Sequence, residues 1–130
     1  MAWITVKPCH GKAFKFLPNG FTPAPVKKNR IVYALGHGLG LPMKLSYCGI
    51  VTDKVYDKKP SMFALDIHIL PGNSGSPIFD ADTHQLVGTI FGLHEIKAVP
   101  NPTDDCVDLK INMKGDFSAV ATHIGPFTIL

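Results

Sequence analysis

The stretch Pro71-Gly72-Asn73-Ser74-Gly75-Ser76-Pro77 decides the fold. It lies between two apolar segments, residues 62–70 and residues 86–93. A serine in a tight, glycine-rich loop between two strand-like segments holds its hydroxyl outside the packed layer, where it is able to act as a nucleophile. The flanking glycines tolerate backbone angles that a Cβ forbids. We therefore expect the N–H groups of Gly72 and Ser74 to point at one spot and to stabilise a developing oxyanion.

A second motif precedes this loop. It runs Ile31-Val32-Tyr33-Ala34-Leu35-Gly36-His37-Gly38-Leu39-Gly40-Leu41-Pro42 and continues with Gly49-Ile50-Val51, and Ile78-Phe79-Asp80 and Leu86-Val87-Gly88 follow the serine loop. In this order and at this separation, the motifs resemble the second barrel of chymotrypsin-fold serine peptidases, most closely the bacterial trypsin-like branch with the HtrA/Deg proteases. Taken alone, the Asn-Ser-Gly sequence would also fit an ordinary turn.

The resemblance assigns roles to individual residues. It implies that Ser74 is the catalytic nucleophile and that the N–H groups of Gly72 and Ser74 form the oxyanion hole. Asn73 occupies the place of an aspartate that, in digestive trypsins, pairs with a newly cut N-terminal amine; an amide cannot form that ion pair, so no such zymogen switch is expected. No metal and no cofactor are implied. The substrate pocket would contain six residues: His68, Ile69, Thr89, Ile90, Phe91 and Gly92.

His68 is open to two interpretations. At the base of the pocket it would favour an acidic or polar substrate side chain. Alternatively it is a hydrogen-bonded structural histidine, which is also the alternative for the chain's other histidines near the motifs, His37, His84, His94 and His123.

Composition predicts an all-β fold. The chain has 130 residues, the size of one domain, with 45% hydrophobic residues, 12 Gly and 11 Pro. Strand patterns separated by turn signals predict an antiparallel six-stranded Greek-key barrel. The expected strands cover residues 31–35, 44–52, 62–70, 76–79, 85–91 and 117–123, with 107–113 as an extra strand or a loop.

The resemblance also divides the chain into two parts. Residues 1–30 would hold a remnant of the last first-barrel strand, with Ala2, Ile4 and Val6 in its pattern, and the connection between barrels. Residues 31–130 would form the C-terminal barrel that carries the nucleophile loop. The resemblance implies that the catalytic base and the group that orients it belong to a first barrel, which we expect to be largely absent here. A triad rebuilt from the chain's own six histidines and the carboxylates Asp53, Asp57 and Asp66 is the alternative.

These features predict a trypsin-like serine endopeptidase that hydrolyses peptide bonds through a Ser74 acyl-enzyme, the chain being its C-terminal half and inactive alone. The alternative is a noncatalytic half-barrel that binds peptides or proteins. Expected partners are a peptide or protein substrate and the missing first barrel, in cis or in a second chain. The face that this barrel would cover is expected to be apolar and exposed, which predicts self-association.

Charge and cysteine content exclude other classes. The formal charge is +3, and the small cluster of Lys27, Lys28 and Arg30 is interpreted as a solvated loop, so neither nucleic acid nor membrane is an expected partner. No apolar run approaches the roughly 20 residues of a spanning helix, and no export signal is visible. The three cysteines, Cys9, Cys48 and Cys106, are odd in number and widely spaced, so no disulfide framework is expected.

Overall fold

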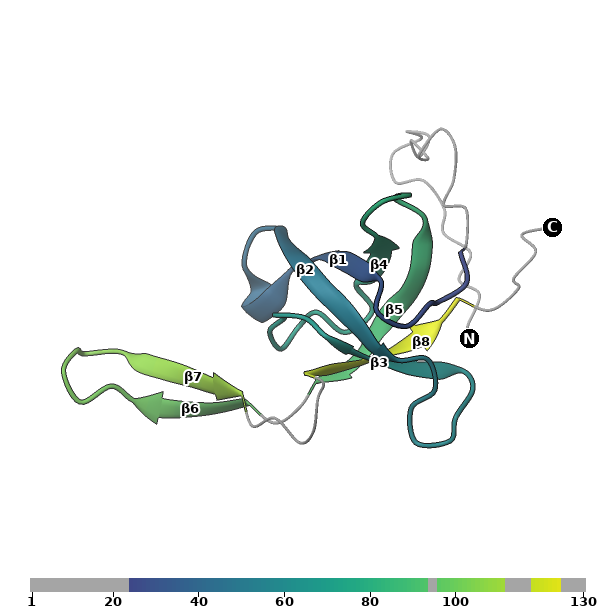
Figure 1. Ribbon diagram of the computed structural model, residues 1–130. Helices are drawn as coiled ribbons and strands as arrows, with labels where there is room; N and C mark the ends of the chain where they lie inside the picture. Colours follow the sequence, from purple (N-terminus) through teal and green to yellow (C-terminus); the bar gives the residue numbers. More distant parts are fainter. Residues whose placement is uncertain (1–23, 94–95, 112–117, 125–130) are drawn as a thin grey trace, which may run out of the picture.

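The computed structural model describes residues 24–93, 96–111 and 118–124. Residues 1–23 lie outside the described residues. They include the expected strand pattern at Ala2, Ile4 and Val6, the cysteine Cys9, and most of the expected connection between barrels. The described part contains eight strands and one short 3-10 helix, and Figure 1 shows their arrangement. The elements are β1 (Ile31–Gly36), η2 (Gly38–Gly40), β2 (Lys44–Asp53), β3 (Met62–Asp66), β4 (Pro77–Asp80), β5 (Leu86–Leu93), β6 (Ile96–Pro100), β7 (Val107–Ile111) and β8 (Ala119–His123).

Six of the strands close into a barrel in the order β1-β2-β3-β8-β5-β4, and each neighbouring pair is antiparallel. Strands β1, β2 and β3 follow one another as neighbours, and β4 returns to pair with β1, which is a Greek-key connection. The predicted fold class, an all-β antiparallel six-stranded barrel, is confirmed. Closure removes the open strand edges that would otherwise pair with other chains.

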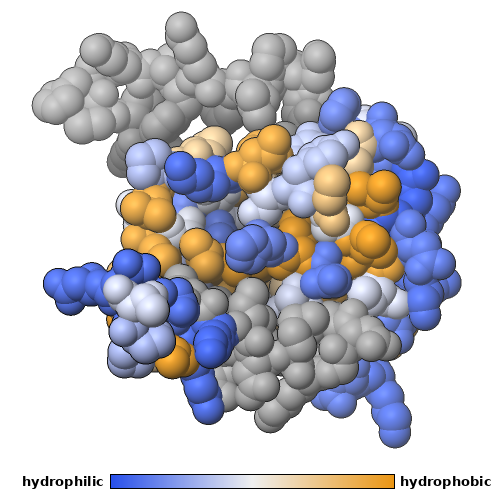
Figure 2. Space-filling model, turned by 60° about the vertical axis from the view of Figure 1, so that its left-hand side comes forward, coloured by the Kyte–Doolittle hydropathy of each residue, from blue (hydrophilic) through white to orange (hydrophobic). Residues whose placement is uncertain are grey.

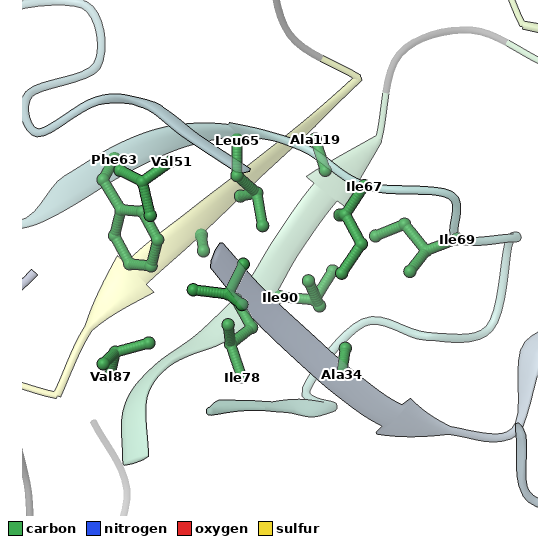
Figure 3. Packing of buried hydrophobic residues seen from close by; sticks show 12 residues of the cluster. Ala34, Val51, Phe63, Leu65, Ile67, Ile69, Ile78, Val87, Ile90 and Ala119 are labelled. Atoms are coloured by element: carbon green, nitrogen blue, oxygen red, sulfur yellow. The ribbon is translucent and has the colours of Figure 1, made fainter. Parts of the chain in front are cut away.

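The core fills the inside of this barrel. Each of the six barrel strands contributes apolar side chains to it, at alternate positions in β1, β3 and β8 (Figure 3). Phe63, Leu65 and Ile78 are fully buried at the centre. Gly88 lies where a Cβ would meet the Phe63 ring at 2.6 Å, so the ring occupies the space that a larger residue would need.

The predicted strands match the observed ones closely, except for β3. The prediction of one strand over 62–70 is wrong beyond Asp66. The reason is a side chain: Ser118 Oγ accepts a hydrogen bond from the Ile67 N–H at 2.8 Å and donates one to the Ile67 carbonyl at 2.9 Å. Because both backbone groups of Ile67 are satisfied in this way, the strand ladder ends, and the chain turns toward the serine loop with Ile67 and Ile69 still in the core.

A hairpin of β6 and β7 forms a separate two-stranded sheet and projects away from the barrel (Figure 1). The sequence prediction left 107–113 as a strand or a loop; the structure has strand β7 over Val107–Ile111. The sequence prediction missed β6, whose short apolar run ends at Pro100. Cys48 and Cys106, the two cysteines in the described residues, are free and exposed.

The segment before β1 packs on the barrel. Ala24 N–H donates to Leu86 O at 2.9 Å, and Ala24 and Val26 pack against the core. Lys27 and Lys28 are exposed as expected of a solvated loop. Arg30 is half-buried, and its guanidinium binds the carboxylates of Asp80 and Asp82, an ion pair that the interpretation as a solvated loop did not include. Arg30 and Asp80 are 50 residues apart in the chain, so the sequence around Arg30 does not reveal this ion pair.

Exposed apolar side chains concentrate in one stretch of the described chain, residues 31–50. Of the ten large hydrophobic residues exposed in the described chain, seven lie between residues 31 and 50: Ile31, Leu39, Leu41, Met43, Leu45, Tyr47 and Ile50. We call these seven residues the apolar face. Figure 2 shows hydrophobic groups side by side across the middle of one face of the molecule. Clusters of this kind are typical of interaction surfaces.

Candidate active site

The serine loop connects β3 to β4 and is anchored at both ends by backbone hydrogen bonds. The Asn73 N–H donates to Leu70 O at 3.2 Å, and the Ser76 N–H donates to Asn73 O at 2.9 Å. The Gly75 N–H donates to Ile90 O at 2.7 Å, and the Ile90 N–H donates back to Ser76 O at 2.9 Å. The loop therefore has a defined shape and is attached directly to β5.

Two N–H groups in this loop remain available. Gly72 has φ 95°, a left-handed conformation that favours glycine, and a Cβ here would lie 3.2 Å from His37 O. Among the described residues, neither the Gly72 N–H nor the Ser74 N–H has a hydrogen-bond partner. Ser74 is exposed, and its hydroxyl makes no hydrogen bond within the described chain. A free hydroxyl beside two free N–H groups is what an oxyanion site requires.

A neighbouring turn supports the loop from the other side. The Leu39 N–H donates to Pro71 O at 2.6 Å, and the Gly40 N–H donates to His37 O at 3.1 Å, so the turn around η2 is attached to the residue before Gly72. This turn is the Gly-rich part of the motif at residues 31–42. The two motifs found in the sequence therefore meet in space.

The side chain of Asn73 is buried between the same two segments, with 7% of its surface exposed. Its Nδ2 donates to Leu70 O at 3.1 Å, and its Oδ1 accepts a hydrogen bond from Ser76 Oγ at 3.4 Å. A Cβ built at Gly36 would overlap both Asn73 Oδ1 and Ser76 Oγ. Sequence reasoning did not assign Gly36 or Ser76 to the site; the Gly-His-Gly spacing at 36–38 is the only signal that pointed there.

A hollow of about 590 Å³ opens beside Ser74. Its walls combine the serine loop with apolar side chains from β1, β4 and the turn that leads into β2. It is lined by Leu35, Gly36, His37, Met43, Gly72, Ser74, Gly75, Ser76, Pro77 and Phe79. The hollow is large enough for several side chains of a substrate or of another folded unit.

His37 lies at this hollow but does not contact Ser74 through a hydrogen bond. Its Nδ1 lies 3.1 Å from Leu41 O. Because a carbonyl only accepts, Nδ1 carries the proton in this contact, and Nε2 of the neutral ring keeps a lone pair. The imidazole is thus held in the tautomer that accepts a proton at Nε2.

The other described histidines have different surroundings. His84 Nδ1 lies 3.1 Å from the Tyr33 hydroxyl, and His123 Nε2 lies 3.1 Å from Lys54 O, which agrees with structural roles for both. His68 is exposed at a separate hollow of about 180 Å³ that Asn73 also lines. None of these histidines forms a hydrogen bond with Ser74. His10 and His94 lie outside the described residues.

The six predicted substrate-pocket residues have different surroundings in the described part of the chain. The side chains of Ile69 and Ile90 are in the barrel core, 3% and 2% exposed. Thr89 Oγ1 lies 2.8 Å from Thr122 Oγ1 on the neighbouring strand. Phe91 and Gly92 share a hollow of about 200 Å³ with Tyr56, Leu93 and Val120, whereas His68 lies at the hollow beside Asn73. Ile69 also lines the hollow beside Asn73, whereas the backbone N–H and C=O of Ile90 are hydrogen-bonded to Ser76 O and the Gly75 N–H.

The described part of the chain has neither a cluster of metal-ligating side chains nor a membrane-spanning helix. No group of three or more His, Cys, Asp or Glu side chains there is placed to hold a metal ion. Within the same residues, no helix has the length and apolar character needed to cross a membrane.

Comparison with known proteins adds one finding. A family model described as a trypsin-like peptidase domain matches residues 4–88, which include both motifs and the whole serine loop. No curated protein and no solved structure matches the chain at a significant level. The matched segment covers most of the barrel and ends in β5.

Proposed function

The chain belongs to the family of trypsin-like peptidase domains, and we propose that it carries the nucleophile of a serine endopeptidase, Ser74. The observation that supports this most is the geometry around Ser74: an exposed hydroxyl beside the Gly72 and Ser74 N–H groups, which have no partner in the described residues. The HtrA/Deg-like branch and the specificity pocket at residues 68–69 and 89–92 stay predictions.

The proposed reaction uses these groups in sequence. Ser74 Oγ attacks the carbonyl carbon of a peptide bond while a base takes the hydroxyl proton. The carbonyl oxygen becomes an oxyanion and accepts hydrogen bonds from the N–H groups of Gly72 and Ser74. The C–N bond then breaks, and the base returns its proton to the leaving amine. Water hydrolyses the resulting acyl-enzyme by the same route and frees Ser74.

The base is the part that the described chain does not bring to Ser74. We propose that a second folded unit supplies it, in the same protein or in another chain, and that this unit docks at the hollow beside Ser74. Leu35, Met43 and Phe79 give the hollow apolar walls, and the apolar face continues from Met43 along β2. Burial of such a surface favours association by roughly 25 cal/mol per Å² of apolar area, before the entropic cost of binding is subtracted. The same surface supports self-association when the partner is absent.

A noncatalytic binding module is the second candidate function. The absence of a histidine hydrogen-bonded to Ser74 in the described chain favours it. In that case the hollow and the apolar face would hold a peptide or protein without reaction at Ser74. The two candidates differ in one property, the reactivity of the Ser74 hydroxyl.

Labelling with a fluorophosphonate probe tests that reactivity. The probe is applied to the 130-residue chain, to a form extended by its native upstream coding sequence, and to Ser74→Ala in both. Ser61→Ala, which removes an exposed hydroxyl far along the chain from the loop, is the matched control. Ser74-dependent labelling confined to the extended form supports the proposal.

Two other outcomes contradict parts of it. Ser74-dependent labelling of the short chain would mean that its own residues supply the base, and loss of labelling in His37→Gln would then identify it. Absence of labelling in both forms would reject the peptidase and favour the binding module. Ser74→Ala is expected to keep the wild-type stability, since the Ser74 hydroxyl makes no hydrogen bond in the described structure.

A further inference from the structure

The loop that presents Ser74 is closed by side chains without charge. Asn73 uses both ends of its amide: Nδ2 donates to Leu70 O at 3.1 Å, and Oδ1 accepts from Ser76 Oγ at 3.4 Å. Ser76 is itself 9% exposed, and its backbone N–H and C=O bind Asn73 O and the Ile90 N–H. A chain of hydrogen bonds therefore runs from Leu70 through the loop to β5.

The neighbouring turn leaves just enough room for this amide. At Gly36 a Cβ would overlap Asn73 Oδ1 and Ser76 Oγ, and at Gly38 it would lie 2.8 Å from Asn73 Nδ2. The amide thus fills the space between two glycines and the loop. With its position fixed, the peptide groups on either side of Gly72 are fixed as well, because only two residues separate Leu70 from Asn73.

We infer that the Asn73 amide and the Ser76 hydroxyl form a neutral lock that holds the Gly72 and Ser74 N–H groups in their oxyanion-binding positions at every pH at which the barrel is folded. This inference rests on the proposed function for its catalytic meaning. It makes Asn73 and Ser76 positioning residues, since neither side chain contacts a reacting atom. It also means that neither proton uptake nor chain cleavage is needed to order the loop.

Ionisable groups do lie near Asn73 but do not hold it. Lys44 from β2 and His68 from the segment after β3 line the small hollow that Asn73 also lines, and His37 is adjacent to Gly38. No hydrogen bond or ion pair joins any of these three side chains to Asn73 in the described structure. The two hydrogen bonds of the amide are made instead to a backbone carbonyl and a hydroxyl.

The first test replaces Asn73 by its ionisable isostere. In Asn73→Asp the protonated carboxyl still donates to Leu70 O and accepts from Ser76, whereas the carboxylate has no proton to donate and faces a carbonyl. The pKa of the new carboxyl is therefore raised above the value of about 3.9 in the unfolded chain. The hydrogen bond from the protonated carboxyl to Leu70 O therefore contributes fully to loop order below the unfolded-state pKa. This contribution is lost as pH rises through the folded-state pKa.

The readout is the ¹H–¹⁵N amide shifts of Gly72 and Ser74 in the full 130-residue chain from pH 4.5 to 8. In Asn73→Asp we expect the shifts to match those of the wild type at the acidic end and to depart progressively from the wild-type values recorded at the same pH as pH rises. Asn101→Asp is the control, because Asn101 lies in the β6–β7 turn and its Oδ1 accepts hydrogen bonds from Thr103, a role that a carboxylate keeps; its own donation, from Nδ2 to Asp108 Oδ1 at 3.5 Å, is exposed. Shifts in Asn73→Asp that match the wild type over the whole range would overturn the lock.

A second variant decides the question if Asn73→Asp does not fold. Ser76→Ala removes only the hydroxyl, and we expect displaced Asn73 side-chain NH₂ shifts, displaced Gly72 and Ser74 amide shifts, and exchange of the Asn73 N–H about tenfold faster. Unchanged values would reject the inference. Neither readout needs a reactive serine, so a failed lock and a failed peptidase assignment give separate signals: the first in these spectra, the second in the labelling experiment.

Discussion

The guanidinium of Arg30 donates two hydrogen bonds to the carboxylate of Asp80, from Nε to Oδ2 at 2.9 Å and from Nη2 to Oδ1 at 2.7 Å. Arg30 immediately precedes β1, and Asp80 ends β4, the strand that follows the serine loop. Oδ1 also accepts the N–H groups of Asp82 and Thr83, each at 3.0 Å. The hydrogen bonds from Arg30 and from the two N–H groups hold the pKa of Asp80 well below its usual range, although burial opposes this effect.

Replacement of Asp80 by Asn is predicted to destabilise the barrel by about 2 kcal/mol at pH 7, because charge-assisted hydrogen bonds to a mostly buried group are lost. The pKa of Asp80 is lower in the folded than in the unfolded chain, so its contribution is complete above about pH 4 and is lost as pH falls toward the folded-state value. Urea unfolding at pH 7, 5 and 3 measures both effects. Asp80→Asn should lose less stability than the wild type between pH 5 and 3.

Asp82 provides the control for this prediction. Its side chain is 71% exposed and contacts Arg30 with one oxygen at 2.9 Å. Asp82→Asn should therefore change stability by less than about 1 kcal/mol. Equal losses in the two variants, or the same pH slope in Asp80→Asn as in the wild type, would contradict the assignment.

Gly36→Ala is predicted to destabilise the chain by roughly 1–3 kcal/mol, because the added methyl overlaps Asn73 Oδ1 and Ser76 Oγ and must displace the serine loop. Gly92→Ala is the matched control, since a Cβ there has no atom within 4 Å. Thermal unfolding followed by circular dichroism compares the two. Similar melting temperatures would mean that the loop does not fit against β1 as described.

Ser118→Ala is predicted to cost about 2 kcal/mol, because it leaves the buried N–H and C=O of Ile67 without their partner. The same change at Ser61, which is exposed, should alter stability by less than about 0.5 kcal/mol. Urea unfolding measures the difference. If Ser118→Ala is as stable as Ser61→Ala, the end of β3 does not depend on the Ser118 hydroxyl.

The apolar face is predicted to cause concentration-dependent self-association of the chain. Leu45 is 60% exposed there, and Leu45→Glu places a charge where contact would desolvate it. Sedimentation velocity should show a mean mass that rises with concentration for the wild type and stays monomeric for this variant. Val107→Glu, on the hairpin at 58% exposure, is the control and should associate like the wild type. A wild type that remains monomeric at all concentrations would count against the proposed partner surface.

Different parts of the site were predictable to different degrees. The sequence pointed to Ser74 and Gly72, because a glycine-flanked serine between two apolar segments is a local pattern. It did not point to Ser76 or to the fit of Asn73 against Gly36, because these contacts depend on which strand lies beside the loop. The pocket prediction at residues 68–69 and 89–92 distributed six residues along two segments, and the structure places two of their side chains in the core.

The sequence by itself determined the strands of the barrel and the position of the serine loop, because alternating apolar residues and glycine-rich turns act over a few neighbouring residues. Only the tertiary structure decided where β3 ends, which acid binds Arg30, and which groups close on Asn73. Each of these depends on residues 50 or more positions apart or on the packing of separate segments. Closure of the barrel brings those partners within hydrogen-bond distance, and no local pattern in the sequence predicts these contacts.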